Sequence, residues 1–125
     1  MDLIRRAEVP AQALPGRTIQ SVIGKDAHVH SGKMTVGFAR YAPETGPMEP
    51  HHHAEETIYI VGARDAWVRF GQDPAQLGPQ LPLETGMVLH FPELEWHQFG
   101  FQGDGYVDAL FCYGQVDNIR PEAGT

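Results

Sequence analysis

The sequence has little of what several classes of protein require. Its 125 residues include one cysteine, Cys112, so no intramolecular disulfide can form, which suits a reducing compartment. No apolar run approaches the length of a membrane span, and the first residues lack the apolar segment of a signal peptide. We therefore expect a soluble, cytoplasmic protein with no membrane partner.

Basic residues are also scarce. Lys and Arg number 9 against 16 Asp and Glu, which gives a formal net charge of −7. Such a surface repels a phosphate backbone, so nucleic acid is not an expected partner. Acidity by itself does not indicate which small molecule binds.

Helical periodicity is absent, since no segment repeats apolar residues at i, i+3 and i+4. Instead, 14 glycines and 10 prolines divide the chain into short apolar runs. These predict seven or eight strands and thus an all-β sandwich or barrel, with residues 71–86 as a loop and 115–125 as an exposed tail. Within the tail, Val116 and Ile119 can pack against the barrel or a partner subunit. The expected strands span 17–23, 33–42, 56–61, 66–70, 87–91, 96–101 and 106–113, with a turn at 62–63.

The length and the 42% of hydrophobic residues fit one domain covering residues 1–125. Within that domain, histidines gather in two places. In an extended chain, residues i and i+2 point to the same face, so His51 and His53 can converge while His52 faces away. Glu55 and Glu56 follow directly, and His97 comes after a strand that ends at Pro92.

Imidazole and carboxylate together suit a divalent iron, manganese, nickel, cobalt or zinc ion. The absence of nearby cysteines argues against a structural zinc site. Alternation along the expected strand distinguishes the two glutamates. Glu56 lies on the same face as Ile58 and Ile60, whereas Glu55 lies on the face of Thr57, Tyr59 and Val61. Glu56 is the favoured ligand, and Glu55 stays as an alternative.

The two histidine segments resemble the two motifs of the cupin superfamily. The second motif matches through Gly86, Pro92 and His97, with Leu94 where a glycine is usual and Phe101 where an asparagine is usual. In the first motif Gly46 lies one residue closer to His51 than usual, and two residues separate His53 from Glu56. Strict spacing would instead make His52 the second histidine.

The resemblance covers about residues 33–113. It implies a double-stranded β-helix, or jelly-roll barrel, in which three histidines and one glutamate hold one divalent metal ion. On this chain those ligands would be His51, His53, Glu56 and His97, with His52 as the alternative to His53. The resemblance also implies a homodimer, which fits an exposed edge strand.

Other residues have simpler interpretations. We expect His28 and His30 on an exposed hairpin edge, His90 in the pocket or core, and Cys112 as a buried thiol. Arg40 is either a surface charge or an anion-binding group. Aromatic residues that we expect in the core or an interface are Tyr41, Tyr59, Trp96 and Phe99.

Two classes of function follow. The first is a metal-dependent enzyme acting on a small polar metabolite, a sugar derivative or organic acid, by dioxygenase, isomerase or lyase chemistry. Its catalytic residues are not identified, and Tyr41, His90 and Glu55 are the candidates for a general base. The second is a non-catalytic barrel that binds or senses a small ligand.

Overall fold

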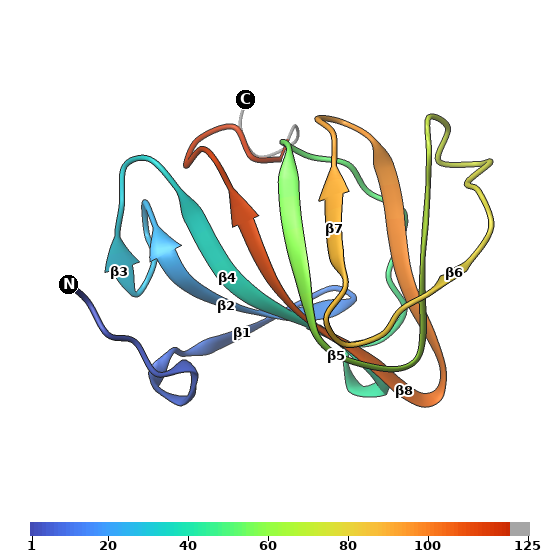
Figure 1. The fold of residues 1–125 in the computed structure, drawn as a ribbon, viewed down its shortest axis with the longest axis horizontal. Helices are drawn as coiled ribbons and strands as arrows, with labels where there is room; N and C mark the ends of the chain where they lie inside the picture. Colours follow the sequence, from blue (N-terminus) through green and yellow to red (C-terminus); the bar gives the residue numbers. More distant parts are fainter. Residues whose placement is uncertain (121–125) are drawn as a thin grey trace.

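A computed structural model describes residues 1–120, and its backbone forms one antiparallel system of strands. The strand order is β1-β2-β4-β8-β5-β6, with β7 also paired to β5 and a short parallel pairing of β3 with β2. Figure 1 shows these strands curling into two facing walls that are open at one end. The expected all-β fold is therefore confirmed. The strands are β1 (Ala11–Leu14), β2 (Arg17–Gly24), β3 (Val29–His30), β4 (Thr35–Tyr41), β5 (Glu56–Gly71), β6 (Leu81–Pro82), β7 (Val88–Phe91) and β8 (Trp96–Tyr113), with 3₁₀ turns η1 (Arg6–Glu8) and η2 (Pro43–Thr45).

Strands β5 and β8 are longer than expected and join the two walls. Each was expected as two strands, but both run on continuously, and they pair along almost their whole lengths. The expected turn at 62–63 is wrong: Gly62 and Ala63 stay in β5, and pairing shifts register between Ile60 and Gly62 and again between Arg64 and Ala66. The second irregularity contains Asp65 in a left-handed conformation, with φ of 46°. Such bulges bend a strand without ending it.

Strand faces are set by alternation. Along β5, Glu56, Ile58 and Ile60 are buried while the residues between them are exposed, which confirms the parity expected for Glu56. The buried core combines aliphatic and aromatic side chains from β4, β5, β7 and β8. Its most enclosed members are Ile60, Phe99, Val107 and Ala109.

The same alternation corrects two expectations. Cys112 is exposed, not buried, because Phe111 and Tyr113 on either side of it face the interior. His90 is exposed as well, because Leu89 and Phe91 are the inward residues of β7. Its Nε2 lies 2.6 Å from Oε2 of the exposed Glu55, so both groups lie on the outer surface.

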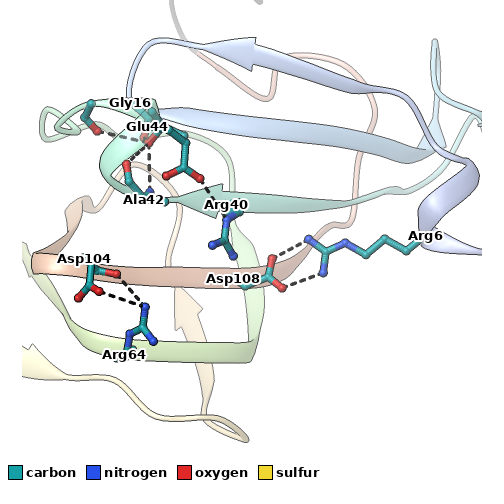
Figure 2. A network of polar contacts seen from close by, with 10 residues as sticks. Arg6, Gly16, Arg40, Ala42, Glu44, Arg64, Asp104 and Asp108 are labelled. Atoms are coloured by element: carbon teal, nitrogen blue, oxygen red, sulfur yellow. Dashed lines mark hydrogen bonds and ion pairs between the residues drawn. The ribbon is translucent and has the colours of Figure 1, made fainter.

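The outer surface of β4 and β8 carries a series of arginine–carboxylate pairs (Figure 2). Arg6 makes a two-pronged contact with Asp108, at 2.6 and 2.8 Å, and attaches the N-terminal segment to the barrel. This pairing raises the pKa of Arg6. Arg40 pairs with Glu44 at 3.6 Å, so it is the surface charge of the two alternatives. His28 and His30 are exposed, as expected.

Two further departures concern segments expected to be irregular. The expected loop 71–86 contains β6, which pairs with Trp67 and Val68 of β5. The first residues of the expected tail lie against the barrel instead of extending from it, and Ile119 packs against the core, which confirms the packing on the barrel that was one alternative for this residue. Within this C-terminal strap (residues 115–120), the carbonyl of Ile119 accepts a 2.7 Å hydrogen bond from the backbone N–H of Ala54. Residues 121–125 of the expected tail lie outside the described residues.

Candidate metal centre

Backbone pairing brings the two histidine segments together. His51 and His97 form an isolated antiparallel bridge, with N–H to carbonyl distances of 3.0 and 2.9 Å. The backbone N–H of Leu94 donates to the carbonyl of His53 at 2.8 Å. These three bonds hold the segment before β5 against the turn before β8. Segments more than 40 residues apart in the chain thus supply neighbouring side chains.

Three imidazoles converge at this junction. His51, His53 and His97 each offer a nitrogen, and these atoms lie within 4.8 Å of one another. Their ring centroids are separated by 4.3 to 5.2 Å. We call this group the histidine cluster. His52 is not part of it, because its ring turns away and packs against Trp96 at a centroid distance of 3.9 Å.

Backbone carbonyls determine which nitrogen of each ring faces the centre. Nδ1 lies 3.4 Å from the carbonyl of Glu49 in His51, 2.9 Å from that of Ala54 in His53, and 3.0 Å from that of Glu95 in His97. A carbonyl can only accept, so Nδ1 carries the proton in each neutral ring. Nε2 then presents a lone pair, the form in which imidazole binds metals.

Burial keeps these rings neutral. It lowers the pKa of His51 to about 2, that of His53 to about 4 and that of His97 to about 3. Neighbouring histidines lower the values of His51 and His97 further, because two charged rings would repel each other. The cluster is therefore an array of acceptors at neutral pH.

Glu56 lies beside the cluster at the start of β5. Its Oε1 is 3.4 Å from Nε2 of His53, and both side chains are buried. Burial raises the pKa of Glu56 to about 7, an effect that the Tyr113 hydroxyl opposes. Burial also raises the pKa of Tyr113, and the Glu56 charge adds to that shift. No sequence motif indicates Tyr113 as a site residue, because its position opposite Glu56 depends on the register of β5 and β8.

The donor set fits a divalent cation. Within residues 1–120, Nε2 of His97 and Oε1 of Glu56 are buried without a hydrogen-bond partner, which is costly for polar atoms, and Nδ1 of His52, outside the cluster, is the third such atom. Two acceptors 3.4 Å apart, such as Nε2 of His53 and Oε1 of Glu56, also need a cation or a proton between them. Nitrogen and oxygen ligands of this kind suit first-row transition metals.

A cavity of about 640 Å³ opens onto the cluster. We call it the barrel cavity. His51, His53 and Glu56 contribute to its lining, together with residues of β2, β4, β5, β8 and the C-terminal strap. Tyr41 lines it too and is buried, so it is the one general-base candidate that faces the cavity. His90 and Glu55 face away.

Comparison with known proteins supports the fold. The sequence matches no protein-family model and no curated protein. A crystal structure of a protein from Planctomyces limnophilus is 21% identical, with a TM-score of 0.68 over 94% of this chain and 91% of that one. The polyketide cyclase RemF from Streptomyces resistomycificus is 20% identical, with a TM-score of 0.67 over 90% of this chain and 78% of that one.

A larger protein contains a unit of similar fold. The oxalate decarboxylase of Lactobacillus farciminis, solved with formate, is 17% identical, with a TM-score of 0.68. The alignment spans 90% of this chain and 33% of the decarboxylase, so this chain corresponds to about a third of that protein. No helix among residues 1–120 is long and apolar enough to cross a membrane. At these identities the likeness concerns the fold, and this chain has the cupin fold, a jelly-roll barrel.

Proposed function

We propose that this chain is a metal-dependent enzyme that holds one divalent ion through His51, His53 and His97, with Glu56 as the fourth ligand. The observation that carries the proposal is the convergence of three neutral imidazoles whose Nδ1 atoms are held by backbone carbonyls. A site in which each ring is oriented by a second contact is typical of metal ligation.

In this proposal, each residue of the site has a distinct role. The three rings and Glu56 hold the ion, and the barrel cavity admits a small polar metabolite to it. A bound divalent ion polarises a carbonyl or hydroxyl of the substrate as a Lewis acid. Tyr113 and Tyr41, both buried beside Glu56, orient polar groups of the substrate and exclude bulk water.

The substrate class of this proposal is a small organic acid or sugar derivative that can chelate the ion, and the reaction class is dioxygenation, isomerisation or a lyase reaction. The proposal also includes the expected homodimer, formed through an edge strand such as β1 and testable by light scattering.

Turnover is tested with metal-loaded protein and a panel of chelating acids and sugars, followed by oxygen uptake and product analysis. We expect turnover that a chelator removes and the ion restores. The matched control is His52→Ala, which changes the neighbouring histidine outside the cluster and should retain activity. Binding without turnover across the panel would contradict the enzyme proposal and favour a ligand-binding barrel.

A further inference from the structure

The C-terminal strap is attached to the barrel at two points. At its start, Oγ1 of Thr35 in β4 donates a 2.7 Å hydrogen bond to the carbonyl of Gln115. Near its end, the half-buried side chain of Ile119 packs against the hydrophobic core and lines the barrel cavity. Between these points the chain bends at Asn118, which has a left-handed φ of 57°. The strap is therefore a defined part of the cavity wall.

One peptide group joins the strap to the histidine cluster. This group lies between His53 and Ala54, and both of its polar atoms have partners. The carbonyl of His53 accepts from the N–H of Leu94 at 2.8 Å, and the N–H of Ala54 donates to the carbonyl of Ile119 at 2.7 Å. The two atoms of a trans peptide point in opposite directions, so the turn before β8 holds the group on one side and the strap holds it on the other.

The same residue orients the ring of His53. Nδ1 of His53 lies 2.9 Å from the carbonyl of Ala54, so Ala54 uses its N–H on the strap and its carbonyl on the ring. Ala54 is buried, and residues 52–55 belong to no strand whose pairing would fix them independently. If the strap releases the N–H, the backbone of Ala54 gains freedom to rotate, and its carbonyl no longer fixes the direction of the ring.

The other two histidines of the cluster do not depend on the strap. His51 and His97 hold each other through two backbone hydrogen bonds of 3.0 and 2.9 Å. Their Nδ1 atoms face the carbonyls of Glu49 and Glu95. Among residues 1–120, neither histidine forms a hydrogen bond with the strap. The strap thus acts on one ring of the three.

We infer that Ile119 is a positioning residue for His53: its carbonyl holds Ala54, and Ala54 orients the ring so that Nε2 faces the centre of the cluster. The carbonyl belongs to the backbone, so the side chain of Ile119 contributes by anchoring the strap in the core. Contacts that orient a ligating ring typically change metal affinity by about 10- to 100-fold. The inference rests on the proposed function for the ion, whereas the hold on His53 exists without one.

Amide hydrogen exchange and nitrogen-15 NMR of chelator-treated protein test the hold on His53. In Ile119→Ala we expect the N–H of Ala54 to exchange about tenfold or more faster than in the wild-type protein, because its acceptor is no longer anchored. The ring of His53 should become a mixture of tautomers. The N–H groups of His51 and His97 should exchange as in the wild-type protein, and their rings should keep the proton on Nδ1.

Three further variants accompany Ile119→Ala. Thr35→Val removes the hydrogen bond to Gln115 and should change Ala54 and His53 in the same direction, which keeps the test valid if Ile119→Ala does not fold. Ile119→Val retains a branched side chain and should resemble the wild-type protein. The matched control is Ile19→Ala, because Ile19 is also half-buried, packs against the core and lines the cavity but belongs to β2.

Competition with a chromophoric zinc chelator then measures the zinc affinity of each protein. We expect Ile119→Ala to weaken zinc binding about fivefold or more, and Ile119→Val and Ile19→Ala to change it less than about twofold.

Unchanged exchange at Ala54 in both strap variants, or an equal change at His51 and His97, would overturn the inference. Faster exchange at Ala54 with unchanged zinc affinity would overturn it too, as would an equal loss of affinity in Ile19→Ala. A wild-type protein that binds no divalent ion would contradict the proposed function instead. In that case, a mixture of tautomers confined to His53 in the strap variants would still support the positioning role of Ile119.

Discussion

Single side chains in the histidine cluster are oriented chiefly by backbone groups. The carbonyls of Glu49, Ala54 and Glu95 each face an Nδ1 atom, so the arrangement of the three rings depends on loop conformation as much as on the histidines themselves. The turn before His97 is the clearest case. Leu94, which occupies the usual glycine position, has φ of 64° and donates its N–H to His53.

A left-handed conformation at a leucine costs about 1 kcal/mol or more, which glycine does not incur. Because the Leu94 side chain is exposed, little packing is lost on its removal. We therefore expect Leu94→Gly to raise the free energy of unfolding by about 1 kcal/mol in urea denaturation. Leu94→Ala is the control, because it removes the same side chain but keeps the strain. A glycine variant no more stable than the alanine variant would show that the turn is not strained.

Strands β2 and β4 both contribute to the wall of the barrel cavity, and their pairing contains an irregularity. Their pairing shifts register between Ser21 and Ile23, next to Gly37 of β4. A Cβ atom at Gly37 would lie 2.5 Å from the carbonyl oxygen of Gln20 and 2.5 Å from the ring of Phe111. Both distances are below any real contact, and the backbone oxygen cannot move aside as a side chain can.

Gly37→Ala is accordingly expected to lower the free energy of unfolding by about 1–3 kcal/mol, the usual cost of overpacking a core. Gly32→Ala is the matched control, since nothing lies within 4 Å of its added methyl group. Thermal and urea unfolding of both variants measure the difference. Equal stability of the two would contradict the assigned register.

The order of apolar and polar residues along a strand predicts which side chains face the core. It does not predict features that depend on how strands pair, such as bulges and the register between two strands. The run from Glu56 to Ile60 alternates in polarity, so its inner face could be identified, and Glu56 was placed correctly. The run around Cys112 is apolar throughout, which leaves its parity unreadable. Gly62 resembled a turn residue, but pairing with β8 keeps it within the strand. Arg120 lay in an expected tail, and only tertiary contacts bring it to the cavity.

For the whole molecule, the buried histidines couple stability to pH when no metal is bound. In the unfolded chain a histidine has a pKa near 6.5, but burial lowers the values in His51, His53 and His97 to between about 2 and about 4. As pH falls below about 6.5, the unfolded chain binds protons that the folded chain does not, so stability falls. Glu56 acts in the opposite direction, because its folded pKa is raised to about 7, but it is one group against three.

We expect chelator-treated protein to be less stable to urea at pH 5 than at pH 7. His97→Gln should reduce this difference by about 2 kcal/mol, the linkage expected of one buried imidazole over that interval. An exposed histidine provides the control, so His28→Gln should leave the difference unchanged. Greater stability of the wild-type protein at pH 5 would contradict the neutral, buried state assigned to the cluster.

The metal content of protein purified without chelator shows whether one divalent ion binds at the histidine cluster. Elemental analysis should find about one transition-metal ion per chain in the wild-type protein and in His52→Ala. That ion should be lost in His97→Ala and in His53→Ala, with weaker binding in Glu56→Gln. A wild-type protein with no affinity for manganese, iron, cobalt, nickel or zinc, or a His97→Ala variant with undiminished metal content, would show that the histidine cluster does not bind a metal ion.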